Sequence, residues 1–284
     1  MNEFSTKKKL FGGEIEIVIK NTEKELFEIA VEESYSLGLE LQKIFNFFDA
    51  KSELSRLNKK RKLKASRDLL ELIKFSLKVC ELSSGFYDIS LGKKILQRKL
   101  GLDEKDVECS YKDILINGDV VELAHPDVML DLGSVAKGYI ADKMIELLQE
   151  MGIKQGLLDA RGDIRVFGQK EEIIDIQHPR KKSKTLGAVK IKNMSIATSG
   201  DYNQYTQTYA RSHLINKTDL ISVTAIAKNL KDADIYATAL AVSPPRVREK
   251  IIRSVPNIAF LTINKNLKPR FYNNFNKFLH EKWK

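Results

Sequence analysis

The sequence has few of the features of a disulfide-bonded, exported or membrane-embedded protein. Its 284 residues include two cysteines, Cys80 and Cys109, which are too few for a disulfide framework and are expected to be free thiols. No apolar run approaches the ~20 residues that a membrane span needs, so no transmembrane segment is expected. The first stretch, MNEFSTKKKLFGGEIEIVIK, has no apolar region before a cleavage site. A cytoplasmic location is expected for the sequence as given. The alternative is an exported or membrane-anchored protein whose leader has been removed.

Signatures of nucleic-acid binding are also missing. The net charge of +10 arises from 48 Lys and Arg against 38 Asp and Glu, but the lysine runs are short and scattered. Neither a zinc-finger spacing nor an RNP-like aromatic motif accompanies them. A solvated basic surface is therefore expected rather than a nucleic-acid partner, although such a surface can also attract a polyphosphate ligand.

Strands and helices alternate along the whole chain, without a repeat, a low-complexity linker or a Pro/Gly-rich hinge. Hydrophobic periodicity predicts helices over 22–48, 66–82, 134–151, 232–242 and 245–255, with SELSRLN at the end of the first and Thr22 as its N-cap. It predicts strands over 13–20, 120–123, 156–158, 164–167, 173–177, 188–198, 220–227 and 258–263, the first of them at a sheet edge. This order predicts a mixed α/β (α+β) fold in one compact unit, with either one lobe or two lobes of non-contiguous segments.

The stretch LDLGSVAKGYIADKM, residues 130–144, begins like a buried strand, turns at Gly133 and continues as a helix. Asp131 can be a plain N-cap for this helix or a ligand-binding carboxylate. A helix N-terminus with nearby glycines and Lys137 suits a phosphate group. The pattern matches neither a P-loop nor G-x-G-x-x-G. A purely structural, capped strand–turn–helix is therefore as well supported as a phosphate-binding site.

A second candidate site is DADIYATALAV, residues 232–242. Asp234 and Thr238 are four residues apart and share one face of the predicted helix. Both supply oxygen, and Mg²⁺ prefers a few protein oxygens together with phosphate oxygens. The alternative is that Asp232 or Asp234 caps the helix and Thr238 faces the core.

Four further stretches can bind a ligand or serve structure alone. Gly162-Asp163 is expected in a tight hairpin turn, and SIATSGDY presents hydroxyls at a strand end or simply turns. SELSRLN forms a polar pocket wall or a helix-end cap cluster. Phe86, Tyr87 and Asp88 suit a planar heterocycle or ordinary packing. His213 is a candidate base, although a lone histidine is more often structural.

Taken together and in this order, the stretches SELSRLN, GFYD, DLGSVAKG, RGDIR, SIATSGDY, HLIN and ADIYATA resemble the ApbE family of Mg²⁺-dependent FAD:protein FMN transferases. The resemblance spans about residues 10–265. It implies a single ApbE-like, T-fold-like flavin transferase domain over residues 1–284, with 266–284 as a C-terminal tail. Arg161 departs from the family's G-G-D, and the loop after Asn216 is shorter than is usual.

The resemblance implies roles for individual residues. FAD would be held by Phe11, Phe48, Asn58, Phe86, Tyr87, Asp88, Asp131, Lys137 and Ile215. Mg²⁺ would be held by a backbone oxygen of Ser134 and by the side chains of Asp234 and Thr238. We expect His213 to act as the base, with Asp163 as the second candidate.

The activity that this resemblance implies is transfer of FMN from FAD to a Thr or Ser hydroxyl of an acceptor flavoprotein, with release of AMP. The alternatives are a Mg²⁺-dependent FAD pyrophosphatase that produces FMN and AMP, and a non-catalytic flavin-binding protein. A storage protein would have no need for the pair formed by Asp234 and Thr238. In the family, an asparagine at the position of Asn58 is typical of transferases, which favours transfer over hydrolysis.

Overall fold

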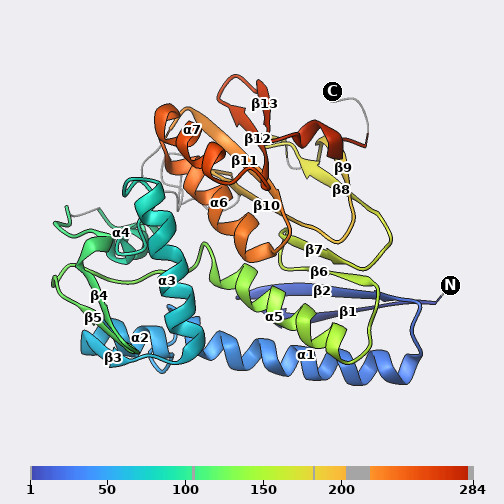
Figure 1. Ribbon diagram of the computed structural model, residues 1–284, viewed down its shortest axis with the longest axis horizontal. Coiled ribbons are helices and arrows are strands. Elements are labelled where there is room, and N and C mark those ends of the chain that lie inside the picture. Colours follow the sequence, from blue (N-terminus) through green and yellow to red (C-terminus); the bar gives the residue numbers. More distant parts are fainter. Residues whose placement is uncertain (1, 104–105, 182, 203–217, 281–284) are drawn as a thin grey trace.

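The computed structural model describes residues 2–103, 106–181, 183–202 and 218–280. Its main feature is an eight-stranded sheet in the order β1-β2-β6-β7-β10-β11-β12-β13, in which all neighbours are antiparallel. Two small sheets accompany it, β3-β5-β4 and β8-β9. Helices lie against the large sheet and around the three-stranded one (Figure 1), which confirms the expected mixed α/β class.

The strands are β1 (Glu3–Leu10), β2 (Gly13–Lys20), β3 (Lys62–Lys64), β4 (Ile114–Asn117), β5 (Val120–Leu123), β6 (Gly156–Asp159), β7 (Ile164–Phe167), β8 (Glu172–Gln177), β9 (Thr185–Ile191), β10 (Ser195–Gly200), β11 (Leu220–Ala227), β12 (Ala259–Asn264) and β13 (Pro269–Tyr272). The helices are α1 (Lys24–Phe45), α2 (Glu53–Lys60), α3 (Arg67–Leu82), α4 (Gly92–Lys99), α5 (Ala136–Glu150), α6 (Leu230–Val242) and α7 (Pro245–Ser254), with short 3₁₀ turns η1 (Tyr111–Asp113) and η3 (Phe275–Phe278). No helix in this part of the chain combines the length and the apolar character that a membrane crossing requires.

Most predicted elements are confirmed, and four details are wrong. The first predicted strand, β2, is internal, because β1 pairs with one of its edges and β6 with the other. The predicted strand 188–198 is two strands, β9 and β10, separated where Asn193 adopts a positive φ of 48°. SELSRLN does not end the first helix but forms α2, which Ser52 caps by accepting a hydrogen bond from the Ser55 N–H. Thr22 is not the N-cap of α1, since Glu23 occupies that position without a side-chain cap.

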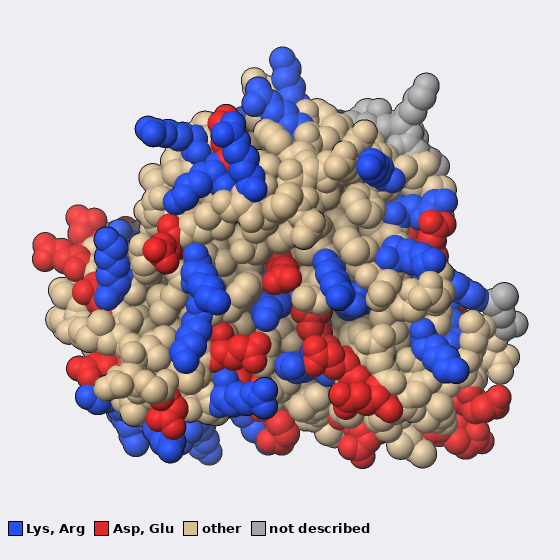
Figure 2. Space-filling view, viewed as in Figure 1, with Lys and Arg blue, Asp and Glu red and all other residues tan. Residues whose placement is uncertain are grey.

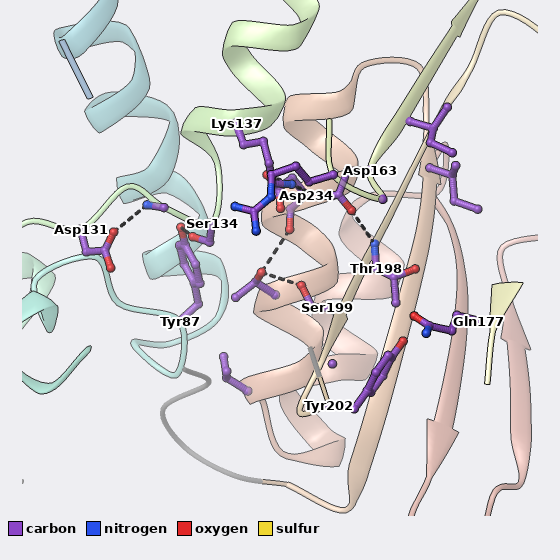
Figure 3. Close-up of a pocket in the computed structure, with 18 of the residues that line it drawn as sticks. Tyr87, Asp131, Ser134, Lys137, Asp163, Gln177, Thr198, Ser199, Tyr202 and Asp234 are labelled. Carbon is purple, nitrogen blue, oxygen red and sulfur yellow. Dashed lines mark hydrogen bonds and ion pairs between the residues drawn. The ribbon is translucent and has the colours of Figure 1, made fainter. Parts of the chain in front are cut away.

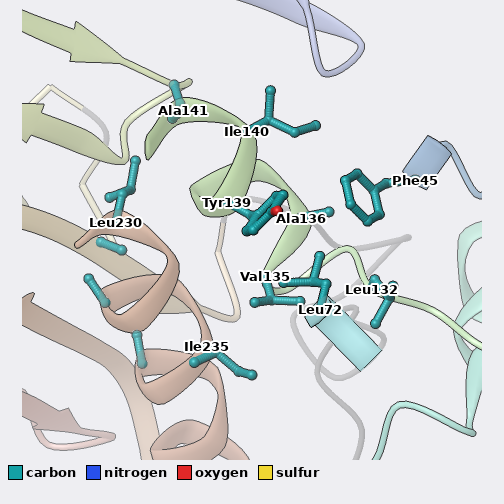
Figure 4. Packing of buried hydrophobic residues seen from close by; sticks show 14 of the residues in the cluster. Phe45, Leu72, Leu132, Val135, Ala136, Tyr139, Ile140, Ala141, Leu230 and Ile235 are labelled. Atoms are coloured by element: carbon teal, nitrogen blue, oxygen red, sulfur yellow. The ribbon is translucent and has the colours of Figure 1, made fainter. Parts of the chain in front are cut away.

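Two apolar cores bury the two faces of the large sheet. The main core lies on the face that carries α1, α5 and α6; Figure 4 shows Tyr139 of α5 and its N-cap residue Val135 between Phe45, Leu72 and Ile235. The second core lies on the opposite face, where Val166, Ile176, Val189, Leu261 and Phe275 pack together. The β8-β9 sheet and η3 cover that face, which places β8 next to the middle of the large sheet.

Helices α5 and α6 approach each other unusually closely. A Cβ on Gly138 of α5 would lie 2.7 Å from the main-chain carbonyl of Leu230 and 2.7 Å from the Lys231 nitrogen. One turn further along α5, the Asp142 carboxylate accepts hydrogen bonds from the N–H groups of Leu230 and Lys231, both at 2.8 Å. These are N–H groups at the start of α6, which have no partner within the helix. This contact fixes the start of α6 against α5, and we call it the α5–α6 clasp.

We expect Gly138→Ala to destabilise the protein by about 1–3 kcal/mol, because the added methyl group meets backbone that cannot move aside. Urea unfolding followed by circular dichroism measures this loss. Gly38→Ala in α1 is the matched control. Its Cβ would meet the mobile ends of Met144 and Leu10, and alanine is the better helix former by ~1 kcal/mol. Equal stability of the two variants would contradict the close backbone contact.

Candidate functional site

A pocket of about 800 Å³ opens where α5, α6, the β6–β7 turn, β8 and β10 meet. Its volume is in the usual range for sites that bind small molecules and cofactors. Side chains from segments that are far apart in the sequence converge on it (Figure 3), among them Tyr87, Ser134, Lys137, Asp163 and Asp234. On the face of the molecule in Figure 2, Lys and Arg gather over α7 and are elsewhere interspersed with Asp and Glu.

The turn before α5 brings Asp131 and Ser134 to the pocket. The Asp131 carboxylate accepts a hydrogen bond from the Gly133 N–H at 2.7 Å, so it closes this turn rather than capping α5, whose N-cap position is Val135. The Ser134 hydroxyl lies 2.8 Å from the Tyr87 hydroxyl. Burial raises the pKa of Tyr87 well above its ordinary value, so this phenol stays protonated at neutral pH. The turn and the neighbouring Tyr87 therefore offer the pocket one carboxylate and two neutral hydroxyls.

Lys137 bridges two buried carboxylates at the centre of the pocket. Its ammonium group contacts the Asp163 carboxylate and lies 3.4 Å from Oδ2 of Asp234. Asp163 is held in place, because its other oxygen accepts a hydrogen bond from the Thr198 N–H at 3.0 Å. The Gly162-Asp163 segment forms the predicted hairpin turn between β6 and β7. The three groups carry a net charge of −1 when all are ionised.

Asp234 is the carboxylate with spare binding capacity. Burial raises its pKa above the ordinary aspartate value, and the Lys137 charge opposes that rise. Its Oδ2 is buried and makes no hydrogen bond with the described residues, which leaves an orphaned acceptor that faces the pocket. A buried anionic oxygen whose compensation is a single long ion pair, the one to Lys137, is incompletely satisfied, so a second cation suits the space beside it.

The residues expected to bind a metal come together around Asp234. Thr238 lies one turn along α6, with its hydroxyl 2.8 Å from that of Ser199 and 3.2 Å from the Asp234 carbonyl oxygen. Ser134 lines the same pocket from the turn before α5. Among the residues that the structure describes there is no group of three or more His, Cys, Asp or Glu suited to a metal. One carboxylate with hydroxyl and carbonyl oxygens does fit a hard cation that also binds a ligand's phosphates.

Three residues expected to bind a flavin line another wall of the pocket. Phe86 is 39% exposed there, whereas Tyr87 is buried. Asp88 also lines the pocket, and its two carboxylate oxygens accept hydrogen bonds from the N–H groups of Ser90 at 2.8 Å and Tyr111 at 2.9 Å. Burial raises the pKa of Asp88, and these hydrogen bonds oppose the rise. Asp88 thus has a structural role in addition to its place in the wall.

Other expected site residues are not in the pocket lining. Phe11 lies in the β1–β2 turn, and its carbonyl accepts a hydrogen bond at 2.7 Å from Arg161, which does line the pocket. Phe48 is 63% exposed, and the Lys99 ammonium lies 4.7 Å from its ring centroid. His213 and Ile215 fall outside the described residues. The roles of these four residues remain predictions.

Asn58 contacts backbone instead of the pocket. Its side-chain amide donates to the Leu130 carbonyl at 2.9 Å and accepts from the Leu130 N–H at 2.7 Å. Arg61, one turn further along the chain, donates to the Val128 carbonyl at 2.6 Å. This amide therefore positions the segment that leads directly into Asp131, which is not the predicted strand but carries only an isolated bridge between Met129 and Leu91.

We expect Asn58→Leu to destabilise the protein by about 2–4 kcal/mol, because both main-chain groups of the buried Leu130 lose their partners. Thermal unfolding measures the loss. Asn58→Asp keeps the acceptor for the Leu130 N–H and should lose less. If both variants have the same melting temperature as the wild type, the two hydrogen bonds do not contribute to the stability of the protein.

Several pocket residues escaped the sequence analysis as individuals. They are Asp159, Asp175, Gln177 and Tyr202, together with Ile173, Ile174 and Ile176 of β8. The stretch SIATSGDY indicated that hydroxyls could be presented here, and Thr198 and Ser199 do line the pocket from β10. The same stretch supplies a structural ion pair, since Asp201 accepts two hydrogen bonds from Arg180 at 2.7 and 2.9 Å. Nothing in the alternating pattern of β8 shows that the strand faces a pocket.

Comparisons with known proteins place this geometry in a family. The sequence profile described as the ApbE family matches residues 11–262. An FAD:protein FMN transferase of Treponema pallidum is 26% identical over 277 residues, which cover 82% of this chain and 76% of that protein. One from Escherichia coli K12 is 27% identical over 236 residues, covering 71% and 67%. The ApbE protein of Thermotoga maritima has the same fold, with a TM-score of 0.84 at 20% identity over 99% of this chain and 100% of the other. Flavin transferase ApbE from Vibrio cholerae superposes with a TM-score of 0.81 at 22% identity, covering 98% and 99%.

Proposed function

The chain belongs to the ApbE family, and on this premise we propose that it is an enzyme that transfers FMN from FAD to a hydroxyl group of an acceptor flavoprotein. The observation that carries the proposal is the orphaned Oδ2 of Asp234 beside Lys137, in a pocket of about 800 Å³. A pyrophosphate with a bound cation satisfies both the free oxygen and the ammonium group. Phe86 and Tyr87 supply aromatic surface to the same pocket.

The reaction exchanges one phosphate ester bond for another. The acceptor's Thr or Ser oxygen bonds to the phosphorus on the FMN side of the pyrophosphate, the bond from this phosphorus to the bridging oxygen breaks, and AMP leaves with that oxygen. The hydroxyl proton passes to a base. We assign this role to His213, with Asp163 as the second candidate. Because Asp163 is held by Thr198 and Lys137, its carboxylate cannot swing away from the pocket wall.

Mg²⁺ would be held by Asp234, Thr238 and a backbone oxygen of Ser134, and when bound it would neutralise charge on the pyrophosphate and the departing AMP. Lys137 provides a fixed positive charge from the other side of Asp234. Since Lys137 is anchored by Asp163, its ammonium is oriented before the nucleotide arrives.

The deciding experiment is a pair of time courses with FAD and Mg²⁺, one without an acceptor and one with a Thr-containing acceptor protein. Flavin fluorescence of the acceptor band in a denaturing gel measures transfer, and chromatography of free FMN and AMP measures hydrolysis. We expect labelling of the acceptor to dominate and EDTA to abolish it. Rapid release of FMN without acceptor, with negligible labelling, would instead identify an FAD pyrophosphatase.

Nucleotide selectivity provides an independent check. We expect calorimetric titration to show binding of FAD and none of NAD, because the chain has no G-x-G-x-x-G turn. Binding of FAD without transfer or hydrolysis would point to a flavin-binding protein. Tight NAD binding with no FAD binding would reject the whole assignment.

A further inference from the structure

One wall of the pocket is the edge of a strand rather than the face of a sheet. Five consecutive β8 residues, Ile173 through Gln177, line the pocket. Successive side chains of a strand point to opposite faces of its sheet. A pocket that is lined by consecutive strand residues must therefore lie beside the edge of the strand, along its backbone. Within the described residues, β8 pairs only with β9. Its second edge therefore runs along the pocket.

The hydrogen-bond pattern shows which main-chain groups face this edge. Asp175 lies opposite Ala188, whose carbonyl points away from β8 and accepts a hydrogen bond from the His280 N–H at 2.9 Å. The Asp175–Ala188 pair is thus a non-hydrogen-bonded one, and the main-chain groups of Asp175 point away from β9. The His178 N–H donates to Lys184 beyond β9, which is consistent with this alternation along β8. Ile173, two residues before Asp175, has the same orientation.

These main-chain groups have no hydrogen-bond partner in the described part of the chain. The far edge of β9 differs, because it is covered by the segment that contains Leu279 and His280. Among the residues that the structure describes, one edge of the two-stranded sheet is thus covered and the edge beside the pocket is not. Exposed strand edges are templates for pairing with another chain, and proteins usually protect them.

Two side chains along this edge, those of Ile173 and Asp175, are exposed. Ile174 and Ile176 point inward and pack in the second core, whereas Ile173 is 55% exposed. Asp175 is exposed and forms no ion pair with the described residues. An exposed isoleucine and an exposed carboxylate, two residues apart on the wall of a pocket, give the edge a preference for particular side chains in a strand that pairs with it. It favours an apolar residue beside Ile173 and a basic or neutral hydrogen-bond donor beside Asp175, and it repels an acidic residue there.

We propose that the free edge of β8 binds the acceptor protein by strand addition, so that an extended acceptor segment forms a third strand beside β8 and its target hydroxyl projects into the pocket. This inference rests on the proposed transferase function. A group-transfer enzyme must hold a polypeptide next to a nucleotide, and main-chain pairing binds an extended segment without requiring one particular sequence. Ile173 and Asp175 then set the side-chain preference at alternate positions.

The first test compares Asp175→Pro with Asp175→Ala. Both variants lose the carboxylate, but only proline also removes the outward-facing N–H. Proline is tolerated at a strand edge where that N–H does not pair within the sheet. We expect transfer to acceptor protein to fall at least about tenfold further in the proline variant, as expected for a lost main-chain hydrogen bond and its geometry. The FAD affinities of the two variants, measured by calorimetry, should agree.

Equal transfer by the proline and alanine variants would overturn the inference. So would a loss of FAD affinity confined to the proline variant, because the edge would then serve the nucleotide. If neither variant nor the wild type transfers flavin although FAD is bound, the proposed function fails, and that outcome is recognisable before the variants are compared.

The second test uses a peptide as the probe. The protein is incubated with FAD, Mg²⁺ and soluble cell proteins, and the flavin-labelled residue is identified by mass spectrometry of tryptic fragments. A synthetic peptide centred on that residue is then methylated at one backbone nitrogen at a time. We expect labelling to be lost at every second position, where the N–H faces β8, and retained between them. Loss without this alternation, or no loss, overturns strand addition while leaving transfer itself established.

Discussion

Replacement of Asp234 by asparagine is expected to lower the rate of flavin transfer at least about a hundredfold while the protein stays folded. The substitution keeps the shape of the side chain but removes the charge of a buried pocket oxygen that makes no hydrogen bond with the described residues. The proposed divalent cation would then lose its anionic ligand on α6, and the pyrophosphate its charge neutralisation. The measurement is the initial rate of acceptor labelling across a Mg²⁺ titration, alongside thermal unfolding.

Asp232→Asn is the matched control on the same helix. Asp232 lies in the first turn of α6, where its carboxylate is 3.4 Å from the Asn229 side chain and does not line the pocket. We expect this variant to retain the wild-type rate within a factor of about two. An Asp234→Asn protein that works at the wild-type rate at ordinary Mg²⁺ concentrations would refute the metal assignment.

Lys137→Met is expected to weaken both the fold and the binding of FAD. The ammonium group is the shared partner of two buried carboxylates, Asp163 and Asp234, which would face each other uncompensated. We expect the free energy of unfolding to fall by about 2–4 kcal/mol. This is near the lower end of the range for a broken buried ion pair, because the Lys137 side chain is still 21% exposed. FAD affinity should fall at least about tenfold, since a positive charge leaves the pocket. Urea unfolding and calorimetric titration measure the two effects.

Lys143→Met on the same helix separates these effects from the mere loss of a lysine. Lys143 pairs with Glu146 at the surface, where its side chain is 36% exposed, so removing it should cost less than about 1 kcal/mol. Its FAD affinity should match that of the wild type. If the two methionine variants prove equally stable, Lys137 does not hold the carboxylate pair together.

Helix and strand positions were predicted correctly from the sequence wherever the local hydrophobic pattern and the tertiary contacts favour the same element. Alternating apolar residues identified β2 and β11, and the spacing of Asp234 and Thr238 correctly placed both on one face of α6. The edge position of β2 was predicted wrongly because alternation reports a buried face and not the number of neighbours. Its partner β1 has burial that alternates between exposed and half-buried, and its lysine-rich sequence gave too weak an apolar signal.

Contacts between distant segments were beyond the sequence. Asn58 was assigned to the nucleotide, but its amide binds the backbone of Leu130, 72 positions away. No local pattern shows that pairing, because it depends on where α2 packs. The same holds for β8, whose alternation is satisfied by the second core and says nothing of the pocket beside it.

The α5–α6 clasp has a thermodynamic consequence for the site. Lys137 belongs to one helix and the Asp234–Thr238 pair to the other, so the distance between the ammonium group and the proposed metal ligands is fixed by Gly138 and Asp142 rather than by a substrate. The conformational entropy of bringing these groups together is lost once, when the chain folds, and not at each turnover. A variant that loosens the clasp should therefore bind FAD with a less favourable entropy, even when every group that touches the nucleotide is unchanged.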